Sequence, residues 1–306
     1  MAQAFHLDGK TAIVTGAGNG LGRAEALSLA DCGANVVLND LAGSAVHEVA
    51  DQIGRDRATV VEGDVSDWST GEALLSAALD FGRLDIVVNN AGVLRDRMVF
   101  TMSPEEWDTV LRVHLRGHFV TTRLATGYWR EASKKADGPV YGRIINTSSE
   151  AFLLGSPGQP NYAAAKAGIV ALTLTTARSC ARYGVRANAI CPRARTDMTA
   201  SLMGAAPDGT DPLAPEHVAP LVSYLASPAA DQINGEVFVV HGGVAAVMEA
   251  PKLKAVFHAA EHGSATGMWT PDSVAAALDG QFDGKGSGFA SMATLVLADE
   301  TIGFSQ

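Results

Sequence analysis

Cysteine is scarce in this sequence. The 306 residues include three, Cys32, Cys180 and Cys191, and no two have the CxxC spacing of a metal site or a redox pair. So few cysteines exclude a disulfide-dense secreted scaffold, and an odd number of them suits a reducing compartment better than an oxidising one. We expect free, buried structural thiols and no metal site.

Basic charge and long apolar runs are also limited. Lys and Arg total 23 against 33 Asp and Glu, so the formal charge is 23 − 33 = −10, which argues against general affinity for nucleic acids or anionic membranes. No apolar run reaches the roughly 18 residues of a transmembrane helix, and residues 1–10 lack a signal peptide's apolar stretch. We expect a cytoplasmic protein with no membrane span and no nucleic-acid partner.

Short apolar runs that alternate with helical patterns are abundant. Runs that are apolar throughout, with crossover helices between them, are typical of a parallel sheet covered on both faces. We therefore predict an α/β fold with a doubly wound, parallel, seven-stranded sheet. The predicted strands are residues 11–15, 35–39, 58–62, 85–89, 142–148, 185–190 and 236–240.

A long helix is predicted to begin after Ser103, because Ser103 can cap it, Pro104 suits its first position and Glu106 completes a capping box. We expect this helix to run to about residue 132. After Gly242-Gly243 the alternation fades. We expect a main domain over residues 1–247 and a C-terminal extension over 248–306, with one helix near 271–278, that serves as a lid or an oligomer contact.

A glycine-rich turn follows the first predicted strand. Gly16, Gly20 and Gly22 have the spacing GxxxGxG, preceded by Thr15, and a helix begins directly after them. Glycines let the backbone approach a pyrophosphate closely, and the helix N-terminus offers unpaired N–H groups and a positive dipole end. The turn predicts a dinucleotide site, although a plain tight turn would give the same letters.

Asp40 ends the second predicted strand, 40 − 22 = 18 residues after Gly22. A carboxylate there can accept both adenosine ribose hydroxyls and would repel a 2′-phosphate. Neither Asn19 nor Leu41 supplies a cation to neutralise such a phosphate. The sequence therefore favours NAD over NADP, with a turn residue as the alternative interpretation of Asp40.

Tyr162 and Lys166 are spaced i and i+4, which puts both side chains on one helix face. A nearby ammonium favours the phenolate, so Lys166 could bring Tyr162 towards neutral pH as a general acid/base. Ser149 ends a predicted strand 13 residues earlier, and Asn90 and Gly92 end another. Ligands of such sheets bind at the carboxyl ends of the strands, where Ser149 could hydrogen-bond a substrate carbonyl.

Taken together, these motifs resemble the short-chain dehydrogenases/reductases, with a match over roughly residues 5–245. The motifs are TGAGNGLG (15–22), Asp64-Val65, NNAG (89–92), Ser149, YAAAK (162–166) and Cys191-Pro192. The resemblance implies a Rossmann fold in which Ser149 polarises the carbonyl, Tyr162 transfers the proton and Lys166 lowers the pKa of Tyr162. The residues that it implies for NAD contact are Gly16, Asn19, Leu21, Asp40, Asp64, Val65, Asn90, Gly92, Tyr162, Lys166, Pro192 and Thr196.

His114 departs from the family, which usually has a catalytic Asn at this position. A narrower branch that shares this His is the hydroxyacyl-CoA dehydrogenase domains of peroxisomal multifunctional enzymes, which this sequence resembles in NNAGVLRDR, VHLRGHF and GRIINTSS. Imidazole can donate and accept, so His114 could anchor a water that relays protons to Lys166. The alternative is a core histidine bonded to backbone.

Arg193 and Arg195 follow Pro192, where the resemblance places a substrate loop. These arginines could grip an anionic group such as a CoA phosphate, or they could form surface salt bridges. Met198, Leu202 and Met203 suit an apolar lid or could pack on the core.

The resemblance implies an NAD-dependent dehydrogenase that oxidises a secondary alcohol. The implied substrate is a 3-hydroxyacyl-CoA or a 17β-hydroxysteroid, including a steroid that bears CoA. A 3-oxoacyl-carrier-protein reductase and a non-catalytic NAD-binding module are the alternatives. Family members associate through their long helices, so a homodimer or homotetramer is also implied.

Overall fold

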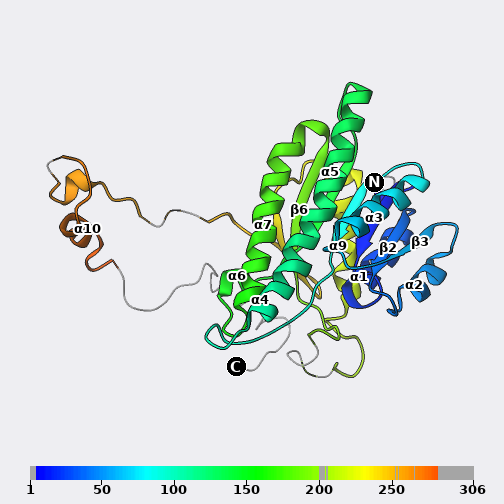
Figure 1. The fold of residues 1–306 in the computed structure, drawn as a ribbon, viewed down its shortest axis with the longest axis horizontal. Coiled ribbons are helices and arrows are strands. Elements are labelled where there is room, and N and C mark those ends of the chain that lie inside the picture. The colour runs from blue at the N-terminus through cyan, green and yellow to red at the C-terminus, as the bar shows by residue number, and fades with distance from the viewer. Residues whose placement is uncertain are drawn as a thin grey trace. The chain divides into compact units, whose positions relative to one another are not determined.

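The chain folds as an α/β protein in which helices pack around one mixed sheet (Figure 1). The sheet has eight strands in the order β3-β2-β1-β4-β5-β6-β7-β8. The computed structural model describes residues 5–199, 204, 206–251, 253, 255–264 and 266–281. The chain divides into two compact units, Met1–Met248 and Glu249–Gln306. The strands are β1 Thr11–Thr15, β2 Asn35–Asp40, β3 Ala58–Glu62, β4 Ile86–Asn89, β5 Gly142–Thr147, β6 Val185–Pro192, β7 Val237–His241 and β8 Val244–Val247.

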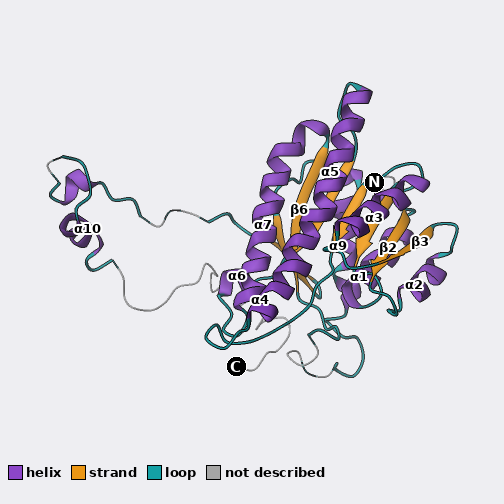
Figure 2. Cartoon of the chain, viewed as in Figure 1, coloured by secondary structure: helices purple, strands orange, loops and turns teal. Residues whose placement is uncertain are grey.

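Helices cover both faces of the sheet, as Figure 2 shows. Side chains alternate along each strand: Ala12 and Val14 of β1 pack on one face, and Ile13 packs on the other. Helices α1, α2 and α9 enclose the first face, and α3, α5 and α7 enclose the second. Their bounds are α1 Gly20–Asp31, α2 Val46–Ile53, α3 Trp68–Asp80, α5 Gly117–Ala136, α7 Pro160–Cys180 and α9 Ala219–Ala226.

The prediction of seven parallel strands is wrong in its count, because the sheet has an eighth strand. Strand β8 pairs antiparallel with β7, from His241 opposite Val244 to Phe238 opposite Val247. Gly242 and Gly243 form the two-residue turn between them, with Gly242 at φ 47°. Glycine pairs are a hairpin signal, but the four apolar residues of β8, VAAV, form a short run that is not among the strands predicted from the sequence. In the structure their side chains are alternately half-buried and exposed.

The long helix predicted after Ser103 is interrupted. Helix α4, Pro104–Leu111, begins with the predicted capping box and passes into a π-helical turn, Arg112–Arg116, before α5 continues to Ala136. A π turn adds one residue per hydrogen-bonded ring and is frequent at functional sites. The turn contains His114, which it places 1% exposed in the protein interior.

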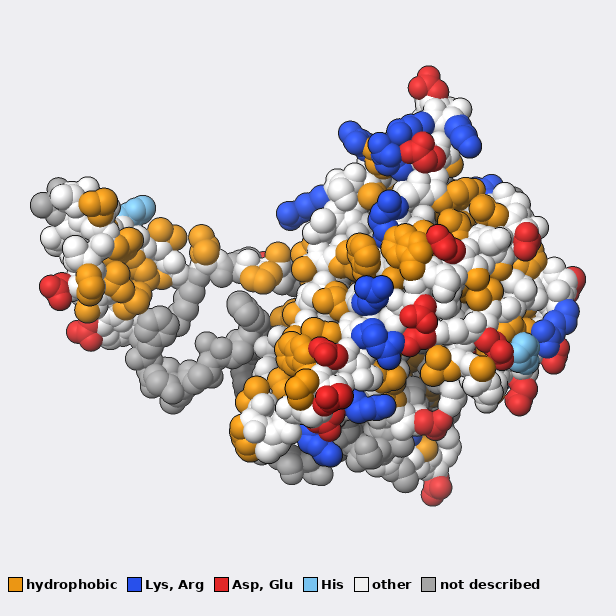
Figure 3. Space-filling model, viewed as in Figure 1, with side chains coloured by type: hydrophobic (Ala, Val, Ile, Leu, Met, Phe, Trp, Pro, Cys, Tyr) orange, Lys and Arg blue, Asp and Glu red, His pale blue; other side chains and the backbone are white. Residues whose placement is uncertain are grey.

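The described part of the second unit holds a short 3-10 turn, Ala259–His262, and helix α10, Pro271–Leu278, at the predicted position. Thr270 and Ser273 form a capping box at the start of α10. This unit carries exposed apolar side chains, and Met268 and Trp269 are among them. Figure 3 shows hydrophobic side chains gathered on the surface of this unit.

The helices and the cysteines can be compared with what the sequence predicts. Within the described residues, no helix is both long and apolar enough to cross a membrane. The cysteines are free; Cys191 is buried as predicted, whereas Cys32 and Cys180 are only half-buried.

Candidate functional site

A cavity of about 510 Å³ opens at the carboxyl ends of the parallel strands. It collects side chains from the loops that follow β1, β2, β3, β4, β5 and β6. Thirteen of the fourteen predicted site residues line it: Gly16, Asn19, Leu21, Asp40, Asp64, Val65, Asn90, Gly92, His114, Tyr162, Lys166, Pro192 and Thr196. The fourteenth, Ser149, lies directly beside Tyr162 and is half-buried.

The glycine-rich turn allows a close approach of backbone to backbone at this cavity. Gly16 and Gly20 have φ angles of 64° and 53°, in the region that favours glycine. A Cβ on Gly22 would lie 2.1 Å from the Gly16 carbonyl oxygen, so only glycine fits there. Asn19 caps α1, and its Oδ1 accepts from Gly20 N at 2.7 Å. The start of α1 therefore faces the cavity as an anion-binding terminus.

Asp40 is held in place by backbone donors. Its Oδ2 accepts from Gly18 N at 2.8 Å and its Oδ1 accepts from Leu41 N at 2.7 Å. The carboxylate is therefore fixed at the end of β2, against the glycine-rich turn, where the ribose of a dinucleotide would lie in this fold.

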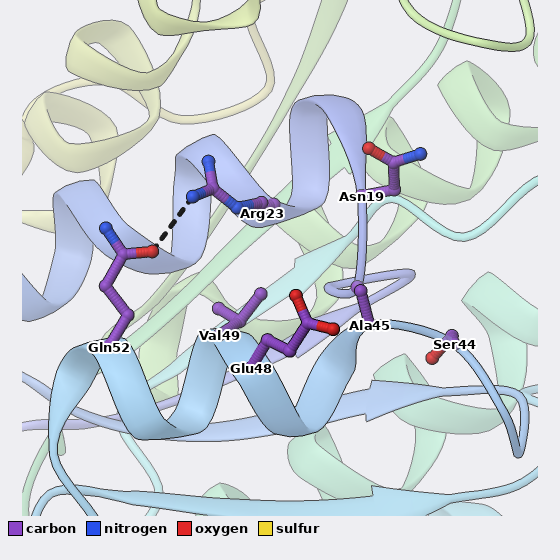
Figure 4. Close-up of a pocket in the computed structure, with 8 residues that line it drawn as sticks. Asn19, Arg23, Ser44, Ala45, Glu48, Val49 and Gln52 are labelled. Atoms are coloured by element: carbon purple, nitrogen blue, oxygen red, sulfur yellow. Dashed lines mark hydrogen bonds between the residues drawn. The ribbon is translucent and has the colours of Figure 1, made fainter.

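A second cavity, of about 380 Å³, lies between α1 and α2 next to Gly18. Figure 4 shows Arg23 of α1 turned along this cavity towards Gln52 of α2, and Glu48 projecting into it. Arg23 Nη2 donates to Gln52 Oε1 at 2.9 Å. Arg23, the one cation among the described residues that line this cavity, is thus hydrogen-bonded to an amide and accompanied by a carboxylate.

Asp64 forms an ion pair with Arg112, which sequence reasoning did not identify. Asp64 Oδ1 also accepts from the backbone and hydroxyl of Ser66, at 2.9 and 2.6 Å. Burial by itself would raise the pKa of Asp64. The hydrogen bonds from Ser66 and the Arg112 guanidinium outweigh burial and hold this pKa below its usual value. The pair joins the loop after β3 to the π turn, 48 residues away, so no local sequence signal could have revealed it.

Tyr162 and Lys166 both face the cavity from the first two turns of α7. Lys166 is 2% exposed, its Nζ donates to the Thr147 carbonyl at 2.6 Å, and the same Nζ lies 5.3 Å from the centre of the Tyr162 ring. Ser149 Oγ accepts from Ala151 N at 3.2 Å, which fixes the turn after β5. The three predicted catalytic side chains are thus brought together.

The electrostatics of Tyr162 differ from the prediction that Lys166 lowers its pKa. Burial raises the pKa of Tyr162 to about 12, and contact with Ser149 opposes this only in part. Burial also lowers the pKa of Lys166 to about 7. With a pKa near 7, Lys166 is uncharged for part of the time at neutral pH, and only its charged form favours the phenolate of Tyr162.

His114 packs against Tyr162. The two rings meet edge to face, with centroids 5.3 Å apart at 89°. His114 Nε2 lies 3.0 Å from Val93 N and 2.8 Å from Val93 O, whereas the buried Nδ1 has no hydrogen-bond partner among the described residues. Burial and the nearby Lys166 lower the pKa of His114 to about 3, so its imidazole is neutral. The ring is bonded to backbone, as the core-histidine alternative requires, but keeps one nitrogen available for a water.

Arg193 and Arg195 are both engaged in ion pairs, and neither extends as a free grip for an anion. Arg193 pairs with Glu150 at 2.6 Å and Arg195 pairs with Asp211 at 2.8 Å. All four side chains are less than a fifth exposed, so these are half-buried pairs rather than the surface salt bridges considered from the sequence.

A family model and two relatives show which known proteins this chain is similar to. The family described as short chain dehydrogenase matches residues 10–205. Hydroxyacyl-CoA dehydrogenase ChsB1 of Mycobacterium tuberculosis is 53% identical over 292 residues, covering 91% of this chain and 90% of that protein. Peroxisomal multifunctional enzyme type 2 of Mus musculus is 42% identical over 253 residues, which are 79% of this chain and 33% of that enzyme.

The similarity extends to solved structures. The crystal structure of a short chain dehydrogenase from Mycobacterium avium has a TM-score of 0.77 and 45% identity, and the match covers 87% of this chain and 91% of that chain. The chain therefore belongs to the short-chain dehydrogenases, oxidoreductases that act on CH–OH groups with a nicotinamide cofactor.

Proposed function

We propose that this protein oxidises the 3-hydroxyl group of a hydroxyacyl-CoA to a ketone, with NAD as hydride acceptor. The observation that carries the proposal is the position of Tyr162. Its ring lies in a cavity that the glycine-rich turn also lines, with Lys166 and His114 against it. The 53% identity to a hydroxyacyl-CoA dehydrogenase supports the substrate class.

The residues of the cavity fit a dinucleotide. The tight turn that Gly16 and Gly22 allow, and the N-terminus of α1 that follows it, suit a pyrophosphate. Asp40 suits the two adenosine ribose hydroxyls. Asp40 and Glu48 would both repel a 2′-phosphate, and Arg23, which donates to Gln52, is poorly placed to compensate. This balance of charge favours NAD over NADP.

The chemistry at the substrate hydroxyl follows from the groups around Tyr162. When bound, NAD supplies the hydride acceptor. Ser149 would hold the substrate oxygen by a hydrogen bond, and Tyr162 would take the hydroxyl proton as the carbonyl forms. The pKa of Tyr162 must fall from about 12 for this step, and the positive charge of an oxidised nicotinamide bound in the cavity would lower it.

Lys166 and His114 connect Tyr162 to solvent in this proposal. Lys166, whose pKa of about 7 lets it hold or release a proton near neutral pH, would bind the nicotinamide ribose and accept the proton that leaves Tyr162. The unpartnered His114 Nδ1 would bind a water in the relay. His114 itself stays neutral, because its pKa is about 3.

The test is the reduction of NAD and NADP in the presence of 3-hydroxyacyl-CoAs of several chain lengths and of 17β-hydroxysteroids, free and as CoA thioesters. We expect NADH formation with the acyl-CoAs and little with NADP. Turnover of free steroids alone would contradict the substrate class, and binding of NAD without turnover of any alcohol would indicate a non-catalytic module. Tyr162→Phe should reduce kcat by at least about a thousandfold, since it removes the acid/base group.

A further inference from the structure

Glu150 and Arg193, the chain neighbours of Ser149 and Pro192, form a two-point ion pair. Arg193 Nε donates to Glu150 Oε2 at 2.6 Å, and Nη2 donates to Glu150 Oε1 at 2.9 Å. The side chains are 10% and 16% exposed. This parallel geometry is the most directional form of a carboxylate–guanidinium contact.

The pair joins two loops that border the site. Glu150 is the residue after Ser149 and the first residue of the turn that begins α6, Ala151–Leu154. Arg193 is the residue after Pro192, and its backbone N donates to the Val240 carbonyl of β7 at 3.0 Å. The loop that carries Ser149 is therefore tied, through two side chains, to the segment after β6, which is itself hydrogen-bonded to β7.

The groups around Glu150 leave the guanidinium as its one charged partner in the described residues. His241 lies close enough to feel both charges, but burial lowers its pKa, so it is neutral near pH 7. Cys191 also lies nearby, and burial raises the pKa of its thiol to about 12, so it too is uncharged.

We propose that the Glu150–Arg193 pair is a positioning device that sets where Ser149 meets the substrate oxygen and Tyr162. The inference rests on the proposed function, because it assigns the pair to that reaction. Neither residue touches the reacting atoms. Displacement of a polar group by about 1 Å is enough to cost up to a hundredfold in rate, so a rigid tie at the neighbouring residue matters for kcat.

The chain offers a matched control. Arg195 and Asp211 form a second pair of similar burial, 15% and 17% exposed, two residues further along the same loop. This pair ties the loop to residues 211–213 rather than to Ser149. Loss of either pair should reduce stability, because it removes the carboxylate that faces a half-buried guanidinium. Only loss of the Glu150 pair should affect the placement of Ser149.

The kinetic test compares Glu150→Gln, Arg193→Met and the apolar double variant E150L/R193M with Asp211→Asn. We expect each of the first three to lower kcat at least about tenfold with KM for NAD changed by less than about twofold. The double variant should lose no more than either single, because the two residues act as one unit. Asp211→Asn should keep kcat within about twofold while melting earlier. Multiplicative losses in the double variant, or equal losses in Asp211→Asn, would overturn the proposal.

A second readout does not depend on turnover, so it separates failure of this inference from failure of the proposed function. In protein labelled with ¹³C-tyrosine, the Tyr162 ring resonance reports contact with Ser149. Glu150→Gln should shift that resonance in the same direction as Ser149→Ala, and Asp211→Asn should leave it unchanged. An unshifted resonance in a folded Glu150→Gln protein would refute the positioning role even if no substrate is turned over. Where the single variants unfold, E150L/R193M provides the measurement, since apolar replacement of a buried pair is often tolerated.

Discussion

His114 meets Tyr162 edge to face, and the π turn of residues 112–116 is what brings the imidazole there. We predict that His114→Asn keeps kcat within about fivefold, because an amide can also donate and accept. His114→Phe should lower kcat at least about tenfold, since the phenyl ring fills the space of the imidazole but cannot bind a water. The measurement is kcat of both variants in H₂O and in D₂O. If His114→Asn and His114→Phe had equal kcat values, a relay through His114 would be ruled out.

Gly92 packs directly against the imidazole ring of His114, and its lack of a side chain leaves room for that ring. A Cβ on Gly92 would lie 2.4 Å from His114 Cε1, a distance that real Cβ atoms do not show. We therefore expect Gly92→Ala to displace the ring, with a loss of about 1–3 kcal/mol in the free energy of unfolding and a lower kcat. Gly43→Ala meets no atom within 4 Å, but φ is 82° there, so it serves as a control for backbone strain alone. If both variants lowered kcat equally, the contact with His114 would not be the cause.

Asp40 should decide the choice of cofactor. Asp40→Ala removes a fixed acceptor for the ribose hydroxyls, so we expect KM for NAD to rise roughly tenfold to a hundredfold, in line with one or two lost hydrogen bonds to a charged group. The additional change Glu48→Gln should lower KM for NADP, because it removes the second carboxylate. Initial rates with both cofactors measure this. An unchanged NAD:NADP ratio in Asp40→Ala would contradict the assignment.

Glu25 predicts how stability depends on pH. It is completely buried in α1, neither carboxyl oxygen has a partner among the described residues, and burial raises its pKa from 4.5 to about 8. Between these values the folded state binds more protons than the unfolded state. The contribution of Glu25 is therefore complete below pH 4.5 and is lost as pH rises to 8, at up to about 1.4 kcal/mol per pH unit.

Glu25→Gln removes this titration. We expect the variant to melt later than the wild type at pH 8, and the difference to shrink or reverse at pH 5. Chemical unfolding at both pH values, with the exposed Glu48→Gln as control, measures the effect. A difference that does not depend on pH would mean that Glu25 does not titrate in this range.

The sequence was sufficient to predict the parts of the site that depend on local spacing. The seven parallel strands follow from short runs that are apolar throughout, the glycine-rich turn follows from the spacing of its glycines, and the pairing of Tyr162 with Lys166 follows from i, i+4 geometry. The π turn could not be predicted this way, because α4 and α5 keep a helical pattern on either side of it. The contacts of Arg112 with Asp64 and of Arg193 with Glu150 join distant segments. The raised pKa of Tyr162 depends on burial, which only the folded protein defines.

The antiparallel strand β8 has a practical consequence. It is short and half-exposed, and it occupies the side of β7 that would otherwise present the open backbone of Val237–His241. An uncovered ladder of Val, Phe and Val residues is a template for strand pairing between molecules. Shortened versions of the protein should therefore retain residues up to Met248, whereas a truncation at Gly243 would yield material prone to aggregate.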